Sequence, residues 1–218
     1  MALRGVKFGE YHTSLNWGLI LNSKTISPPT PKTTYTAIPG RDGDLDQSEA
    51  LTGVVNYNDR VLTFVFLMTD GNYYSRETLL SEILKNIHGK RLDIVLDDDT
   101  SVYFNGRCEV KEVINNNAYG SVTIEATCNP FRLNFVETTK TITLTSSNQT
   151  ITLVNNGGKT LIPTLTVSNS ATITYATGQI TLDAGTYQFD KIVLKTGSTN
   201  LNVRGSGTLK FTYREGRL

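Results

Sequence analysis

The second half of the chain alternates apolar and polar residues with a period of two. Such alternation predicts strands with one face buried and the other in water. Turn sequences rich in Gly, Asn and Asp separate the stretches, and short strands at this spacing favour an antiparallel sandwich or jelly roll. Pro163 cannot donate a backbone hydrogen bond, so its strand should start there or lie at a sheet edge. The clearest stretches are 141–145, 150–154, 172–175 and 179–182.

The first half mixes strand and helix patterns. Residues 60–68 are almost continuously apolar, which predicts a strand buried on both faces. Residues 75–88 predict one helix, with Ser75 as its N-cap and Gly89 in left-handed geometry after its end. A lone helix does not form βαβ repeats, so this half should be α+β with a mainly antiparallel sheet. One apolar stripe should face the core: Leu79, Leu80, Ile83, Leu84 and Ile87.

Two further stretches, 106–113 and 120–128, predict a long hairpin that turns at 115–117. Cys108 and Cys128 flank this hairpin and share strand parity with apolar neighbours. Both thiols should therefore face the core, opposite each other, as small reduced hydrophobic groups. A disulfide formed later, outside the cell, is the alternative.

The composition changes near residue 136, which predicts two domains, 1–136 and 137–218. The first carries 13 basic and 16 acidic residues, a net charge of −3; the second carries 8 and 4, a net charge of +4. Thr occupies 19 of the 82 positions of the second domain. The expected fold is mainly β: an α+β domain with one helix, then an all-β sandwich.

The overall composition excludes several classes of protein. With 218 residues and a net charge of +1, the chain lacks the basic excess of a protein that wraps nucleic acid. No run of about 18 apolar residues predicts a membrane span or insertion. Residues 1–7 lack the apolar region of a signal peptide, so the expected compartment is the cytoplasm.

Three aspartates, Asp42, Asp44 and Asp46, reproduce the start of a calcium loop. An EF-hand would need Gly at the sixth position and Glu at the twelfth, where this chain has Gln47 and Gly53. A solvated turn is the favoured interpretation, and we predict no metal site.

A second acidic run, 97–99, follows a predicted strand, where a magnesium site and a solvated turn are the two interpretations. The turn is favoured because adjacent residues of an extended chain point to alternating faces. His12 and His88 lack ligand-like neighbours, so core or capping roles are expected. Without an activated nucleophile, the sequence predicts no enzyme and no cofactor.

The segment 38–46 is the most informative part of the chain. It reads Ile38-Pro39-Gly40-Arg41-Asp42-Gly43-Asp44-Leu45-Asp46, with two tight-turn dipeptides in succession. It resembles the signature loop of the distal tail proteins of long-tailed siphophages. Other blocks that resemble this family follow in order along the chain: 57–60, 87–90, 96–99, 103–107, 128–131, 155–157 and 213–218.

The resemblance implies a structural virion protein that assembles in the host cytoplasm. Family members form a ring, generally a hexamer, at the distal end of a non-contractile tail, and a back-to-back dodecamer is possible. The second domain is implied to be a galectin-like or carbohydrate-module-like sandwich. Implied partners are the major tail tube protein, the tail-associated tip protein and receptor-binding proteins, while DNA only transits the lumen. The last strand, 208–218, can return to the first domain.

The resemblance also suggests roles for individual residues. The loop 38–46 is the candidate for ring or tube contacts, with an ordinary surface turn as the alternative. Trp17 is a candidate interface anchor, with core packing as the alternative.

Two other functions compete with the tail role. One is a carbohydrate-binding module for host cell-surface glycans, which could use Tyr175 and Tyr187 on the sandwich, although cross-strand packing explains both side chains equally well. The other is a cell-wall hydrolase, which would depend on residues such as Asp42 or Asp97.

Overall fold

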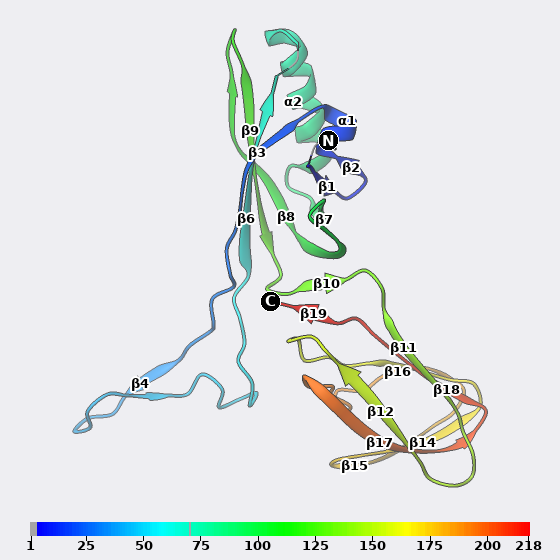
Figure 1. Ribbon diagram of the computed structural model, residues 1–218. Helices are drawn as coiled ribbons and strands as arrows, with labels where there is room; N and C mark the ends of the chain where they lie inside the picture. Colours follow the sequence, from blue (N-terminus) through cyan, green and yellow to red (C-terminus); the bar gives the residue numbers. More distant parts are fainter. Residues whose placement is uncertain (1–3, 70) are drawn as a thin grey trace. The chain divides into compact units, whose positions relative to one another are not determined.

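The computed structural model describes residues 4–69 and 71–218, and Figure 1 shows the arrangement of its helices and strands. Residues 1–3 of the N-terminal segment considered above therefore lie outside the described residues. The chain divides into two compact units, one ending at Arg132 and the other running from Leu133 to Leu218. No helix in the described part of the chain is long and apolar enough to cross a lipid bilayer.

Unit 1 is an antiparallel sheet with two helices. The path through the sheet is β2-β1-β7-β8-β9-β6-β3, and each neighbouring pair is antiparallel. A separate two-stranded ladder is formed by β4 and β5. The elements are β1 (Val6–Phe8), β2 (Tyr11–His12), α1 (Thr13–Trp17), β3 (Ile20–Ile26), β4 (Tyr35–Ala37), β5 (Asp44–Asp46), β6 (Arg60–Met68), α2 (Tyr73–Ile87), β7 (Arg91–Leu96), β8 (Asp99–Asn115) and β9 (Gly120–Cys128).

The core of unit 1 lies between the sheet and the two helices. Phe8 packs edge-on against Phe64, with ring centroids 5.7 Å apart. Along β6 buried residues alternate with half-buried ones. The expectation that both faces of this strand are buried is therefore wrong, because Val61, Val65 and Leu67 lie on a face that the core does not cover.

Helix α2 starts two residues earlier than expected. Its N-cap is Asn72, whose side chain accepts a hydrogen bond from the Ser75 backbone N–H at 3.0 Å, so the assignment of Ser75 as the cap is wrong. Gly89 follows the helix with φ = 75°, as predicted. The stripe is confirmed for the buried positions Leu80, Ile83 and Ile87 and for Leu79, which is partly buried against the core, whereas Leu84 is exposed. A second short helix, α1, has no counterpart in the prediction.

Unit 2 is a sandwich of two four-stranded antiparallel sheets. Their strand orders are β11-β18-β13-β16 and β12-β17-β14-β15. Strand β13 begins directly after Pro163, as predicted. A third pairing joins β10 (Arg132–Asn134) and β19 (Gly216–Arg217). The remaining strands are β11 (Thr138–Thr143), β12 (Gln149–Asn155), β13 (Thr164–Val167), β14 (Ser170–Tyr175), β15 (Gly178–Leu182), β16 (Gly185–Gln188), β17 (Gly197–Ser206) and β18 (Thr208–Tyr213).

One apolar cluster fills the space between the two sheets of unit 2. It includes Leu165 and Phe211 from one sheet and Ile173 and Val203 from the other, all fully buried. The Thr-rich positions lie on the outer faces, where they pair across strands, as Thr172 and Thr181 do at 3.1 Å. The period-two pattern of the sequence thus corresponds to these two faces.

Candidate assembly surface

Residues 27–59 form a long excursion between β3 and β6, which we call the arm. The structure describes all of these residues, and none of them is buried. Backbone hydrogen bonds give the arm its shape: Asn58 N–H donates to Thr30 at 2.9 Å, and Lys32 N–H donates to the carbonyl of Asn56 at 2.8 Å. The arm is therefore an ordered ladder that has no core of its own.

The loop 38–46 lies at the far end of this arm. Strands β4 and β5 pair antiparallel, and residues 38–43 connect them. Gly40 and Gly43 have φ angles of 81° and 73°, in the left-handed region that favours glycine. The Arg41 N–H donates to the carbonyl of Ile38 at 3.2 Å and closes the first turn. The two glycines thus fix a sharply folded loop, of which only Leu45 is partly covered.

The arm presents apolar side chains that nothing in its own chain covers. Leu51 is fully exposed, and Tyr35, Ile38 and Val55 are also exposed. Ordering a backbone costs roughly 1–2 kcal/mol per residue, and burial of apolar surface is the usual compensation. A segment of this length without buried side chains is a candidate surface for contact with another chain.

Arg60 holds the root of the arm in place. Its side chain is only 7% exposed, and its Nε–H donates to the carbonyl of Ser27 at 3.0 Å, across the two ends of the arm. A second donor contacts the carbonyl of Pro130 at 3.2 Å, and the guanidinium lies 5.3 Å from the ring centroid of Phe104. Burial and the nearby Arg132 lower the pKa of Arg60. The root is thus fixed by neutral acceptors and an aromatic face.

The three aspartates of the D-x-D-x-D motif do not converge. The Asp46 carboxylate accepts hydrogen bonds from the hydroxyl and the backbone N–H of Ser48, which lower the pKa of Asp46. Asp42 and Asp44 are exposed. In the described ranges no group of three or more His, Cys, Asp and Glu side chains is arranged to hold a metal ion.

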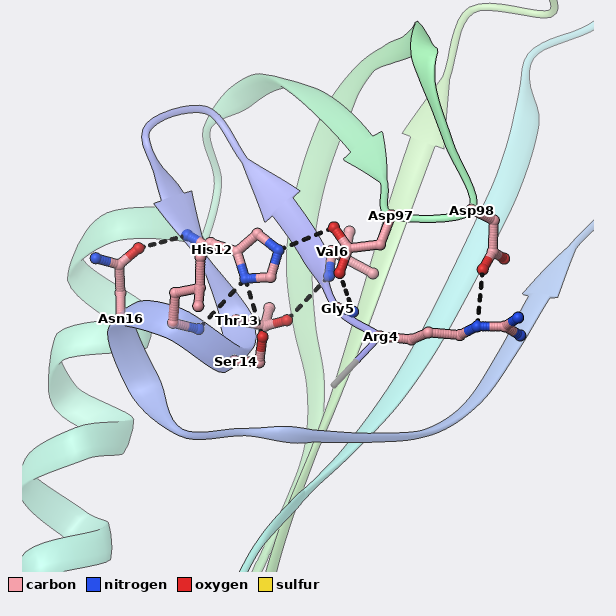
Figure 2. A network of polar contacts seen from close by, with 10 residues as sticks. Arg4, Gly5, Val6, His12, Thr13, Ser14, Asn16, Asp97 and Asp98 are labelled. Carbon is pink, nitrogen blue, oxygen red and sulfur yellow. Dashed lines mark hydrogen bonds and ion pairs between the residues drawn. The ribbon is translucent and has the colours of Figure 1, made fainter. Parts of the chain in front are cut away.

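In the acidic run 97–99, Asp97 and Asp98 contact residues distant in sequence, as Figure 2 shows. One oxygen of Asp97 accepts from the Gly5 N–H at 2.6 Å and the other pairs with His12 Nε2 at 3.0 Å. Asp98 forms ion pairs with Arg4 and Lys24. Asp97 and Asp98 form the expected solvated turn, in which both residues are exposed. Each carboxylate also has partners distant in sequence.

Both histidines cap helices, as expected. His12 is the N-cap of α1, and its Nδ1 accepts from the Leu15 N–H at 3.3 Å and contacts the Ser14 hydroxyl at 3.1 Å. His88 is the C-cap of α2, and its Nδ1 accepts from the Val110 N–H at 3.1 Å. The Ser14–His12–Asp97 series resembles a catalytic triad in composition, but its hydrogen bonds stabilise the start of a helix.

Trp17 lies inside unit 1. Its side chain is 6% exposed, stacks on Tyr11 with ring centroids 5.3 Å apart, and donates from Nε1 to Glu82 at 3.0 Å. Within its own chain this indole is therefore a core side chain. On the arm, the aromatic side chain of Tyr35 is exposed.

A second exposed surface lies where the β8–β9 turn meets the start of α2, and sequence reasoning did not identify it. The guanidinium of Arg76, 2% exposed, donates to Asn115 Oδ1 at 2.9 Å, to the carbonyl of Gly71 at 2.7 Å and to the carbonyl of Asn116. We call these three hydrogen bonds the Arg76 latch. They hold in place a surface with these exposed apolar side chains: Tyr73, Tyr74, Val113, Ile114 and Tyr119. The one signal of this surface in the sequence was Arg76, an isolated arginine within an amphipathic helix.

The two tyrosines considered for glycan binding point inward. Tyr175 and Tyr187 pack against the apolar cluster of the sandwich, and Tyr187 stacks on Phe189 at 5.9 Å. The outer faces instead carry polar side chains bonded to one another, such as Thr150 with Asn202 at 2.9 Å. Both rings are half-buried against the cluster, as cross-strand packing predicted.

Comparison with known proteins gives a match at the level of the fold. No protein-family model matches the chain, and no curated protein matches it in sequence. The crystal structure of SPP1 Dit (gp 19.1), described as a paradigm of the hub adsorption apparatus in phages that infect Gram-positive bacteria, superposes with a TM-score of 0.71. The identity is 15%, over 97% of this chain and 98% of that one. The chain has the Dit fold.

A second structure, of the phage P2 baseplate in its activated conformation with Ca, aligns over 97% of this chain with a TM-score of 0.43 and 9% identity. The match to the Dit fold spans both units, so the predicted mainly β fold is confirmed. At 15% identity the similarity lies in the order of helices and strands rather than in the residues. The short motifs of the sequence, 38–46 above all, pointed to the same fold.

Proposed function

We propose that this chain is a structural protein of a phage tail. It forms a ring, as a hexamer, at the distal end of a long non-contractile tail, links the tail tube to the tip, and serves as the hub for tip or receptor-binding proteins. The carrying observation is the arm: an ordered, wholly unburied segment on a chain that has the Dit fold.

The exposed arm of unit 1 supports a ring. A head-to-tail ring needs two different surfaces on each subunit, one of which meets the other on the next copy. The arm supplies one such surface, with the loop 38–46 at its end and apolar residues along it. The surface latched by Arg76 remains available for the tube protein or the tip protein, which stack on opposite faces of the proposed ring.

The proposed role is structural rather than catalytic. Burial raises the pKa of Cys108 and of Cys128 to about 12, so neither thiol is a nucleophile at neutral pH. His12 and Asp97 are occupied by the cap of α1 and the start of β1. In this role the protein belongs to the virion after assembly in the host cytoplasm, and DNA transits the lumen of the ring.

Size-exclusion chromatography with light scattering tests the ring. The full-length protein should elute as a hexamer of its 24.0 kDa chain, or as a back-to-back dodecamer. A variant in which a short Gly-Ser linker replaces residues 28–58 should be monomeric, because it lacks the surface of the arm. It should still fold, because it keeps Ser27, Arg60 and the unit 1 core. A native emission spectrum of Trp17, the single tryptophan, verifies that this variant is folded. A strictly monomeric wild-type protein at high concentration would contradict the proposal.

A further inference from the structure

Three segments of unit 2 come together where the β12–β17 ladder ends: residues 155–161, residues 192–197 and β19. The buried amide of Asn155 donates to the carbonyls of Lys159 and Leu194, at 2.8 and 3.2 Å, and so joins the first two segments. The carbonyl of Gly216 accepts from the Lys159 N–H at 3.3 Å and joins β19 to them. This end of the sandwich is therefore fixed by hydrogen bonds of its backbone and of one buried side chain.

Each of these segments carries one basic residue, and we call the three together the basic end: Lys159, Lys195 and Arg217. Lys195 and Arg217 are exposed, and Lys159 is half-buried. None of the three forms an ion pair in the part of the chain that the structure describes. The three segments contain no acidic residue, and the neighbouring Glu215 is only 7% exposed. The basic end therefore presents positive charge that its own segments do not compensate.

Exposed apolar side chains accompany these cations in the sequence. Val154 precedes the first segment, Ile162 follows it, and Leu218 follows β19, and all three are exposed. Interfaces between proteins combine apolar contacts with a polar, charged rim. This end of unit 2 thus suits a partner that carries both apolar and acidic residues.

The hairpin at the end of the arm, residues 37–49, has the complementary composition. It carries one basic and four acidic residues, a net charge of −3, and all five are exposed. None of its carboxylates forms an ion pair within the described ranges. The apolar side chains of Tyr35 and Ile38 are exposed beside them. The hairpin and the basic end therefore each lack the charge that the other supplies.

We propose that the basic end of unit 2 binds the arm hairpin of a second copy of the chain. The carboxylates of the hairpin meet the cations of the basic end, and the apolar side chains next to both are buried in the same contact. Opposite charges in such a contact steer the two surfaces together and fix their register. A head-to-tail ring joins two different surfaces of neighbouring copies. The inference rests on the proposed ring and names the surface of the next copy that the arm contacts.

Charge reversal followed by mixing tests the contact. Analytical ultracentrifugation over a concentration series gives the concentration at which half of the chains are assembled. Asp42→Arg with Asp44→Arg should raise this concentration at least about tenfold, as should Lys195→Glu with Arg217→Glu. An equimolar mixture of the two variants should assemble to within about threefold of the wild type. In the mixture each hairpin can meet an end of opposite charge on the other variant, which neither variant offers to itself.

Arg204→Glu with Lys210→Glu, an equal change of charge on exposed positions of β17 and β18, is the control and should leave assembly unchanged. Failure of the wild type to assemble at all would overturn the ring and this contact together. Normal assembly of the Lys195→Glu, Arg217→Glu chain would overturn the contact while leaving the ring intact. Loss of assembly in both variants, folded by calorimetry, without recovery in their mixture would show that the hairpin and the basic end do not bind each other.

Discussion

Cys108 and Cys128 lie diagonally across the β8–β9 ladder: Cys108 is paired with Ala126, whereas Cys128 is paired with Gly106. Both thiols are free and fully buried on the core face. The prediction that both face the core is confirmed, and the prediction that they are opposite each other is wrong by two residues. A β-bulge between Val110 and Glu112 shifts the register of the same ladder towards its turn.

The diagonal pair should be unreactive in the folded protein. Burial raises the pKa of each thiol to about 12, so the thiolate is scarce at pH 8. A colorimetric thiol reagent at pH 8 should modify neither cysteine in native protein and both in 6 M guanidinium chloride. Rapid modification without denaturant would contradict the burial, and absence of both thiols after denaturation would indicate the disulfide alternative.

Replacing Arg76 with Ala should destabilise unit 1. The change removes a buried cation that donates to Asn115, Gly71 and Asn116. Hydrogen bonds to charged groups are worth about 1.5–3 kcal/mol each, and water can replace part of this set at the surface. We expect a loss of about 2 kcal/mol in the free energy of unfolding, measured by urea denaturation monitored through Trp17. Lys85→Ala, an exposed change on the same helix, should cost less than about 0.5 kcal/mol.

Much of this fold follows from patterns in the sequence. Period-two alternation predicted the strands of the sandwich because each of its sheets has one dry and one wet face. The helix end at Gly89 followed from left-handed geometry, which glycine adopts readily. Burial was overestimated for β6, because an apolar run does not show which side another element covers. Only the packing of the helices decides that.

The candidate surface could be predicted only in part. The loop 38–46 was identified from its turn residues, since Gly40 and Gly43 require positive φ angles. The pairing of Arg91 with Arg107 could not be predicted, because it depends on the β7–β8 register, and a shift of one residue would place the two side chains on opposite faces. The latch of Arg76 likewise depends on Asn115, which is 39 residues away in the chain.

The network of Asp97 should make unit 1 sensitive to acid. Partial burial alone would raise the pKa of Asp97, but the hydrogen bonds from His12 and Gly5 and the charge of His12 outweigh it and hold the pKa below its ordinary value of 3.8. A carboxylate with a depressed pKa stabilises the fold above the unfolded pKa, and this contribution is lost as the pH falls below 3.8 through the folded pKa.

This dependence can be measured in urea with Trp17 fluorescence from pH 7 to pH 2.5. Asp97→Asn should be less stable than the wild type at pH 7, and the difference should shrink as the pH falls below 3.8. Asp93→Asn, in β7 four residues before Asp97, is a control for loss of a nearby carboxylate. A difference between wild type and Asp97→Asn that stays constant over the whole range would contradict the electrostatic origin.

Asn155 should be essential to the stability of unit 2. Its side chain is 1% exposed, and its amide donates to the carbonyls of Lys159 at 2.8 Å and Leu194 at 3.2 Å, while its oxygen accepts from the Gly157 N–H at 3.0 Å. Asn155→Ala removes these partners from the Lys159 carbonyl and the Gly157 N–H, each at a cost of about 1–3 kcal/mol, whereas the Leu194 carbonyl keeps its bond from the Leu161 N–H at 3.0 Å. We expect a total loss of about 3 kcal/mol in the free energy of unfolding of unit 2. Trp17 lies in unit 1, so calorimetry rather than Trp17 fluorescence should follow this transition. The adjacent Asn156 is exposed, so Asn156→Ala is a matched control that should leave the transition unchanged. Equal effects of the two substitutions would show that the buried bonds of Asn155 do not stabilise the sandwich.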